Sequence, residues 1–180
     1  GRKGETPPPP LNLIGDFGGG GMFLALGIVS ALLNIKNGGK GQVVDAAMVD
    51  GASVLMSMFY SFRASGFWKD ERESNMLDGG AHFYDSYECL DKKFLSVGAI
   101  EPQFYAILLE KLEIDDERFS QQLNQDQWPE LKAIMRDKIK LKTRDEWAEI
   151  FDGTDACVAP ILSLAEAPEH HHMKARKSFV

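Results

Sequence analysis

Four consecutive glycines, Gly18–Gly21, stand directly before a long apolar segment, and this junction limits the possible folds more than any other feature. Residues 22–35 carry apolar side chains at helical spacing, and Asn37-Gly38-Gly39 is a stop signal, so we expect a helix there. Because glycine has no Cβ, another backbone or a ligand can come close to the run. A helix that starts after it would offer unpaired N–H groups and a partial positive charge to an anion.

Asp16 lies just upstream of the glycines. Its carboxyl group could remove or deliver a proton beside that charge, and an enolate oxygen or a phosphate would be stabilised there. Alternatively, Asp16 is a helix N-cap and the glycines form a tight turn, since aspartate is a favoured cap. The spacing leaves both interpretations open. No Lys-Ser or Lys-Thr follows the run, so we do not expect a nucleotide-binding P-loop.

The first part of the chain has the pattern of an α/β domain. Residues 42–46 include two β-branched valines and predict a strand, and residues 47–65 predict a second apolar helix. We therefore expect residues 1–66 to belong to a larger α/β, Rossmann-like domain. Residues 67–82 are polar and glycine-rich toward their end, which is typical of a linker or an active-site loop.

The second part predicts a small α+β domain over residues 83–167, with a boundary near residue 82 and a return linker over 168–180. Short β-type runs followed by helical patterns indicate this domain. The expected elements are a hairpin of residues 83–89 and 94–99, helices over 102–112 and 128–141, a third helix capped by Thr143 and Glu146, and an edge strand around Pro160.

Composition excludes several classes of protein. A net charge of -7 offers no basic stripe to phosphates, so we expect no nucleic-acid partner. The apolar stretch 22–33 is interrupted by Gly27 and is too short to span a bilayer, so we expect no membrane contact. No signal-peptide pattern is present, which predicts a cytoplasmic location, or an organellar one (peroxisomal or mitochondrial) in a eukaryote.

The potential metal ligands do not form a recognisable set. Cys89 and Cys157 have neither metal-ligand nor disulfide spacing, and we expect both to be buried, reduced thiols. The tract His170–His172 lacks accompanying carboxylate or cysteine ligands, so we interpret it as polar linker. We expect no metal site.

The chain opens on a polar stretch that runs into Pro7–Pro10. A four-proline run is an extended connector and not the start of a fold. We therefore expect this sequence to be a fragment of a longer protein.

Five segments, in order along nearly the whole chain, resemble the α-methylacyl-CoA racemases of the family III CoA-transferase superfamily. They are far more specific together than a single glycine motif. They are residues 10–20, PLNLIGDFGGG; 39–51, GKGQVVDAAMVDG; 75–81, NMLDGGA; 97–105, VGAIEPQFY; and 153–158, GTDACV.

The resemblance implies the family III CoA-transferase fold and an isomerase that inverts the α-carbon of 2-methyl-branched acyl-CoA thioesters. An aspartate and a histidine exchange protons with the substrate through an enolate. The aspartate falls on Asp16, and the helix N-terminus at Gly18, Gly19 and Gly20 would hold the enolate. Coenzyme A is part of the substrate, so no separate cofactor is implied.

The same resemblance places the histidine in a Gly-His-Asp motif, which does not occur here, so it is expected outside this chain; His82 is interpreted as an ordinary loop residue. Glu101 is implied to hydrogen-bond and orient that histidine across an interlocked homodimer, while Tyr84 and Ile100 resemble acyl-pocket positions. From the residues alone, Glu101 would instead be an acid that favours the helix dipole ahead of Pro102.

Two alternative functions stay open. A CoA-transferase of the same superfamily would use Asp16 as a nucleophile and form a mixed anhydride. The chain could also be a non-catalytic, truncated interaction fragment. Residues 98–102 favour the racemase branch, and we expect the 180-residue chain by itself to be inactive.

Overall fold

A computed structural model describes residues 1–179, which form two compact units. One unit is Gly4–Asp70, and the other combines Gly1–Lys3 with the chain from Glu71 onward. The second unit starts before the boundary predicted near residue 82, because Asn75 and Ala81 are already buried in it.

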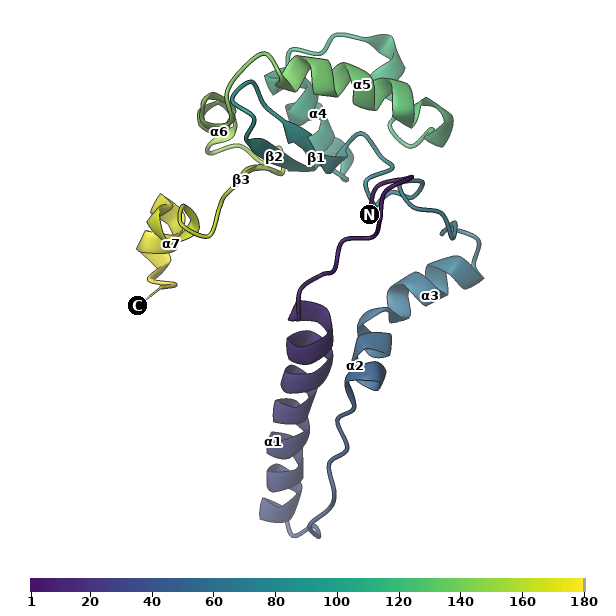
Figure 1. The fold of residues 1–180 in the computed structure, drawn as a ribbon, viewed down its shortest axis with the longest axis vertical. Coiled ribbons are helices and arrows are strands. Elements are labelled where there is room, and N and C mark those ends of the chain that lie inside the picture. The colour runs from purple at the N-terminus through teal and green to yellow at the C-terminus, as the bar shows by residue number, and fades with distance from the viewer. Residues whose placement is uncertain (180) are drawn as a thin grey trace. The chain divides into compact units, whose positions relative to one another are not determined.

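The apolar helix of the first unit begins earlier than the sequence predicts. A π-helix, η1 (Leu13–Met22), runs directly into α1 (Phe23–Lys36), as the ribbon in Figure 1 shows. The four glycines therefore lie inside helical turns, and the predicted helix start after them is wrong. π-helical turns are rare and occur frequently at functional sites.

Close packing between two helices explains why glycines occupy these turns. η1 lies against α2 (Met48–Leu55), and the contact runs through Gly19 and Gly51. A Cβ on Gly19 would come within 2.7 Å of the Ala52 amide nitrogen, and one on Gly51 would collide with the Gly19 carbonyl. The prediction that glycine permits a close backbone approach is confirmed, and the approaching backbone is α2.

The remainder of this unit differs from the prediction in two places. Residues 42–46 form no strand, because a strand needs a hydrogen-bonded neighbour and the described residues 4–70 contain none. The predicted helix over 47–65 forms as two pieces, α2 and α3 (Ser57–Ala64), which meet at Met56.

Together, η1 and α1 form one continuous helix that is longer than the apolar stretch 22–33. Leu13–Lys36 comprises 24 residues with a mean hydropathy of 1.7 in its most apolar window, which suffices by length and composition to cross a bilayer. Residues 22–33 alone are too short for this. A core helix of a soluble protein meets the same criterion, so this length alone assigns no membrane contact.

The second unit contains an antiparallel three-stranded sheet in the order β1 (Tyr84–Glu88), β2 (Phe94–Gly98) and β3 (Val158–Ile161). Tyr84 pairs with Gly98, and Leu95 pairs with Pro160. The predicted hairpin is confirmed. So is the edge position of Pro160, which lacks the N–H that a central strand requires.

Among the described residues of this unit, four α-helices and three short 3₁₀ helices complete the fold. Pro102 occupies the first turn of α4, and Thr143 and Glu146 form the predicted capping box of α6. The bounds are α4 (Pro102–Lys111), η2 (Glu117–Gln121), η3 (Gln125–Gln127), α5 (Trp128–Ile139), α6 (Arg144–Phe151), η4 (Ala167–Glu169) and α7 (His171–Arg176).

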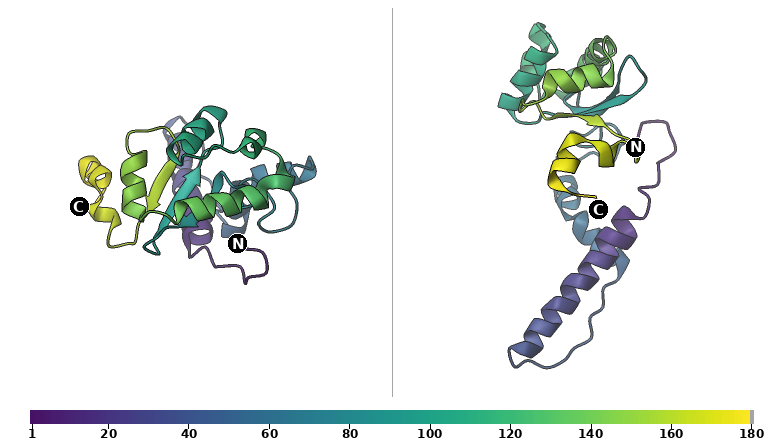
Figure 2. Two further views of the ribbon diagram at one scale, coloured as in Figure 1. Left: turned by 90° about the horizontal axis from the view of Figure 1, so that it is seen from above. Right: turned by 90° about the vertical axis from the view of Figure 1, so that its left-hand side faces the viewer.

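Helices α4, α5 and α6 cover one face of the sheet (Figure 2), and the core side chains come from that face and from these helices. Alternate strand residues point into it, while Ser96 and Phe94 point away. Cys89 is buried as predicted, but Cys157 is exposed, because the chain turns there with a positive φ of 53° before β3 begins. The large, fully buried side chains include Phe83, Leu95, Leu108, Phe119, Leu131 and Trp147.

A network of ion pairs holds residues 1–3 to this unit. Arg2 lies 2.6 Å from Asp85 and 3.0 Å from Glu73, and the buried Lys132 lies 2.6 Å and 3.0 Å from the same carboxylates. Burial opposes ionisation of Glu73, but hydrogen bonds from the Lys3 backbone, Lys132 and Arg2 outweigh it and lower the pKa of Glu73 to about 2. Two cations and two carboxylates therefore neutralise one another where the connector starts.

Candidate active site

Asp16 lies in the first turn of the π-helix and its side chain is exposed. The Phe17 N–H donates to the Asn12 carbonyl at 3.2 Å, so helical pairing has begun by residue 17. The unpaired N–H groups at this end are therefore those that precede Phe17. The positive end of the helix dipole and the Asp16 carboxylate occupy the same turn.

This arrangement corrects the position of the predicted anion site. Gly18, Gly19 and Gly20 were expected to present free N–H groups at a helix N-terminus. In a π-helix each N–H pairs with the carbonyl five residues earlier, so these three donors face backward along the helix. The open donors belong to residues 13–16, directly beside the carboxylate.

Glu101 is the N-cap residue of α4 and is exposed. Its carbonyl accepts the N–H groups of Phe104 and Tyr105, both at 3.0 Å, but its side chain makes no capping hydrogen bond. Within residues 1–179, the Glu101 carboxylate makes no hydrogen bond or ion pair. The Glu101 carbonyl thus accepts the first hydrogen bonds of α4, while the Glu101 carboxylate takes no part in capping the helix.

Tyr84 and Ile100 lie near Glu101 at one end of the sheet. Both are half-buried and pack against the core. The Tyr84 ring lies beside Gly98, with a ring carbon 3.7 Å from the place that a Cβ on Gly98 would occupy, which is ordinary van der Waals contact. The structure brings Tyr84, Ile100 and Glu101 together, whereas Asp16 belongs to the other unit.

Two further residues contact this end of the sheet and were not predicted. The Gln122 side-chain amide donates to the carbonyls of Ala99 and Ile100 at 3.1 and 3.0 Å. The Cys157 carbonyl accepts the Gly98 N–H at 2.9 Å. Gln122 lies in a polar stretch after a short helix, and no local sequence pattern reports its contact, which joins residues more than 20 positions apart.

His82 lies in the turn before β1, as predicted, but its side chain belongs to the core. It is fully buried, with ring Nε2 2.7 Å from the Tyr105 hydroxyl. That hydroxyl donates to the Phe119 carbonyl at 3.2 Å, so Nε2 is the donor of a neutral imidazole. Burial lowers the pKa of His82 to about 4. A histidine held in this way is unsuited to exchanging protons with a bound substrate.

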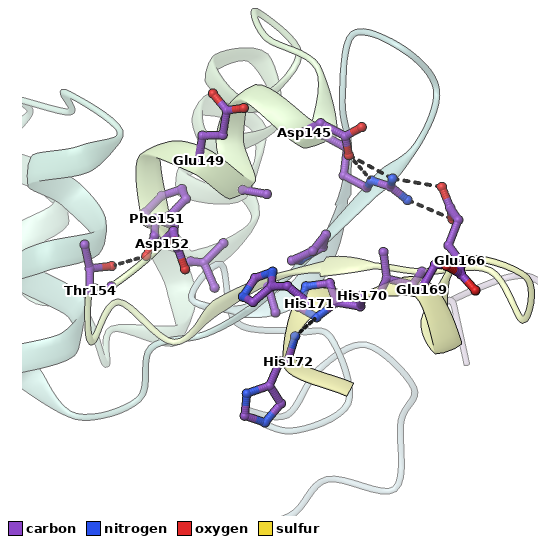
Figure 3. Close-up of a pocket in the computed structure, with 17 residues that line it drawn as sticks. Asp145, Glu149, Phe151, Asp152, Thr154, Glu166, Glu169, His170, His171 and His172 are labelled. Carbon is purple, nitrogen blue, oxygen red and sulfur yellow. Dashed lines mark hydrogen bonds and ion pairs between the residues drawn. The ribbon is translucent and has the colours of Figure 1, made fainter. Parts of the chain in front are cut away.

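A separate cleft of about 730 Å³ lies between α6, β3 and the C-terminal turns. Figure 3 shows His170, His171 and His172 on one side and the acids of α6 on the other. The Arg144 guanidinium, which lies near the cleft, is paired with Glu166 at 2.9 Å. Among residues 1–179, no group of three or more potential ligands is arranged to hold a metal ion.

Comparison with known proteins matches the whole chain to one family. The model of CoA-transferase family III matches residues 1–180. The chain is 49% identical to the α-methylacyl-CoA racemase of Mus musculus and 48% identical to that of Homo sapiens, over 180 residues in each case. These alignments cover 100% of this chain and 47% of each relative, so the chain spans about half the length of the curated relatives it matches.

A solved structure supports the same fold. The crystal structure of a hypothetical protein from Mycobacterium tuberculosis superimposes with a TM-score of 0.73 at 19% identity, covering 96% of this chain and 46% of that one. The matched family, the two racemases and the shared fold agree with the five sequence segments and with the expected fold class. The chain belongs to CoA-transferase family III.

Proposed function

We propose that the protein to which this chain belongs is an α-methylacyl-CoA racemase, an isomerase that inverts the α-carbon of 2-methyl-branched acyl-CoA thioesters. One observation carries the proposal: in a chain 49% identical to a curated racemase, the exposed Asp16 carboxylate shares a helix turn with the open N–H groups of residues 13–16. A proton acceptor and an anion-stabilising group are the two parts that enolate chemistry requires.

In the proposed reaction, Asp16 removes the α-proton on one face of the thioester or returns it in the reverse direction. The negative charge that develops on the thioester oxygen is stabilised by the positive end of η1. Because coenzyme A is part of the substrate, the reaction needs no separate cofactor. The cytoplasmic or organellar location expected from the sequence stays a prediction.

A second proton-transfer group is needed on the opposite face, and we propose that it is a histidine outside residues 1–180. His82 is excluded by its burial and its bond to Tyr105. We assign Glu101 to orient that histidine in a homodimer, and Tyr84 and Ile100 to contact the acyl group. The uncommitted carboxylate of Glu101 supports this assignment.

The proposal is tested with the complete protein, expressed over its whole coding sequence. A single enantiomer of a 2-methylacyl-CoA is incubated in deuterated water, and both chirality and deuterium content are followed. We expect loss of chirality together with deuterium at the α-carbon. Transfer of coenzyme A to a second carboxylic acid, without α-exchange, would support the family's transferase chemistry, in which Asp16 is the nucleophile.

Two matched substitutions test the role of Asp16. Asp16→Asn should lower kcat about 10²- to 10⁴-fold, the usual contribution of a positioned acid or base. Asp50→Asn is the control, because Asp50 is also an exposed acid in the first turn of an apolar helix, α2. Equal activity of the two variants would remove Asp16 from the mechanism.

A further inference from the structure

The short turn that precedes α4 fixes the backbone from which the Glu101 side chain extends. β2 ends at Gly98, the Ala99 N–H donates to the Phe83 carbonyl at 3.0 Å, and the Ile100 N–H donates to the Gly98 carbonyl at 3.0 Å. Glu101 follows with an extended ψ of 140° and begins the helix. The N–H groups of this turn are thus fixed by backbone acceptors, whereas the carbonyls of Ala99 and Ile100 need a separate donor.

Gln122 supplies that donor from another part of the chain. One side-chain amide nitrogen donates to both carbonyls, at 3.1 and 3.0 Å. Gln122 is itself held, because its carbonyl accepts the indole N–H of Trp128 at 2.8 Å, and Trp128 is only 4% exposed. A chain of contacts therefore runs from the buried indole through Gln122 to the turn.

The bond to the Ile100 carbonyl acts on Glu101 directly. This carbonyl belongs to the same planar peptide unit as the Glu101 nitrogen, so fixing its oxygen fixes the plane from which Glu101 departs. The peptide unit after Glu101 is already fixed by the first turn of α4. The exposed carboxylate makes no hydrogen bond of its own among the described residues, so the backbone is what fixes the point and the Cα–Cβ direction from which the side chain extends.

We infer that Gln122 is a positioning residue for the proposed racemase reaction: it acts through Glu101 by holding the two carbonyls that aim that carboxylate. This inference rests on the proposed function. Gln122 need not touch the substrate. A group held from two sides loses less freedom when it meets its partner, and small displacements in such a site have large effects on rate.

The experiment is a double-mutant cycle in the complete protein, with inversion of a chiral 2-methylacyl-CoA as the assay. Gln122→Ala should lower kcat about 10- to 100-fold and change KM by less than about twofold. In a Glu101→Gln background, the same change should lower kcat by less than about twofold, because the carboxylate that Gln122 aims is absent. Gln121→Ala is the control, since the Gln121 side chain accepts a hydrogen bond from Asn124 and, among residues 1–179, makes none to the turn before α4.

A purely structural role predicts a different result. Gln122→Ala would then lower stability and reduce kcat by the same factor in both backgrounds, and that additivity would overturn the inference. If Gln122→Ala does not fold, Gln122→Met keeps the length of the side chain without its donor, and wild-type kcat in this variant would also overturn it. Absence of inversion by the wild-type protein would instead overturn the proposed function and this inference together.

Discussion

The two units of this chain bury their apolar residues to very different extents. From Phe83 to Ala156, large side chains such as Leu95, Leu131 and Trp147 are almost completely inaccessible. Among the described residues 4–70, Ala31 is the one apolar residue with a buried side chain. Helix α1 exposes leucine, isoleucine and valine on several faces. A helix that is apolar all round belongs in a core or in another apolar environment.

The difference shows which unit can bury its apolar side chains by itself. The sheet, α4, α5 and α6 supply one another with apolar surface, so the second unit contains its own core. Residues 4–70 hold together mainly through the close glycine contact between η1 and α2. Large exposed apolar patches mark interfaces, so the stability of residues 4–70 depends on surface outside those residues.

Separate expression of the two units is the strongest test of this difference. We expect residues 71–180 to unfold cooperatively, with a free energy of about 5 to 10 kcal/mol, because they contain a complete core. Residues 4–70 alone should show no cooperative transition and no slowly exchanging amides. Thermal denaturation by circular dichroism and hydrogen exchange measure both quantities, and a cooperative transition in residues 4–70 would contradict the interpretation.

Two leucine truncations compare the units within one molecule. Leu131 of α5 is 1% exposed and Leu32 of α1 is 60% exposed. Leu131→Ala should therefore lower the free energy of unfolding of the second unit by about 2 to 5 kcal/mol through lost burial and a residual cavity. Leu32→Ala should change the stability of isolated residues 1–180 by less than about 0.5 kcal/mol.

Urea denaturation of the two variants provides the measurement. A large effect of Leu32→Ala in residues 1–180 would mean that α1 is already packed in a core. In the complete protein, the same substitution tests whether α1 is covered by surface that residues 1–180 lack. A loss there that is absent from residues 1–180 would identify α1 as part of an interface.

The same division explains which features the sequence predicts. The hairpin, the α6 capping box and the edge position of Pro160 depend on residues a few positions apart, and all three are confirmed. The helix start at Leu13 depends on α2, which is distant in sequence and comes close only where both helices have glycine. The strand predicted over 42–46 fails for a similar reason, since its formation requires a neighbouring strand.

The candidate site divides in the same way. Asp16 and Glu101 are predicted from the motifs that contain them, and both are exposed in the structure, while their roles stay a proposal. The open N–H donors at residues 13–16 and the hydrogen bonds of Gln122 are products of the three-dimensional fold. Neither carries a periodicity or spacing that could have identified it in advance.

The pH dependence of stability also distinguishes the two units, and we expect this effect to be the smallest of those predicted. All four histidines lie in the second unit, and His82 is the one in its core. Because burial lowers the folded-state pKa of His82 to about 4 from 6.5, the unfolded chain binds a proton first as the pH falls. Stability is therefore fully present above pH 6.5 and is lost between 6.5 and 4.

We expect the second unit to lose about 2 kcal/mol between pH 7.5 and pH 5, at 1.36 kcal/mol for each pH unit below the unfolded-state pKa. The pKa values of the Glu73, Asp116, Glu146 and Glu166 carboxyls are lowered as well, but these groups contribute mainly below their usual values of 3.8 to 4.5, so the loss above pH 5 comes chiefly from the imidazole. His82→Phe should remove the pH dependence, whereas His172→Phe, at an exposed position in the second unit, should keep it. Equal pH dependence in wild type and His82→Phe, measured by urea denaturation, would show that another group titrates. The spectrum of isolated residues 4–70, which contain no histidine, should stay unchanged over the same range.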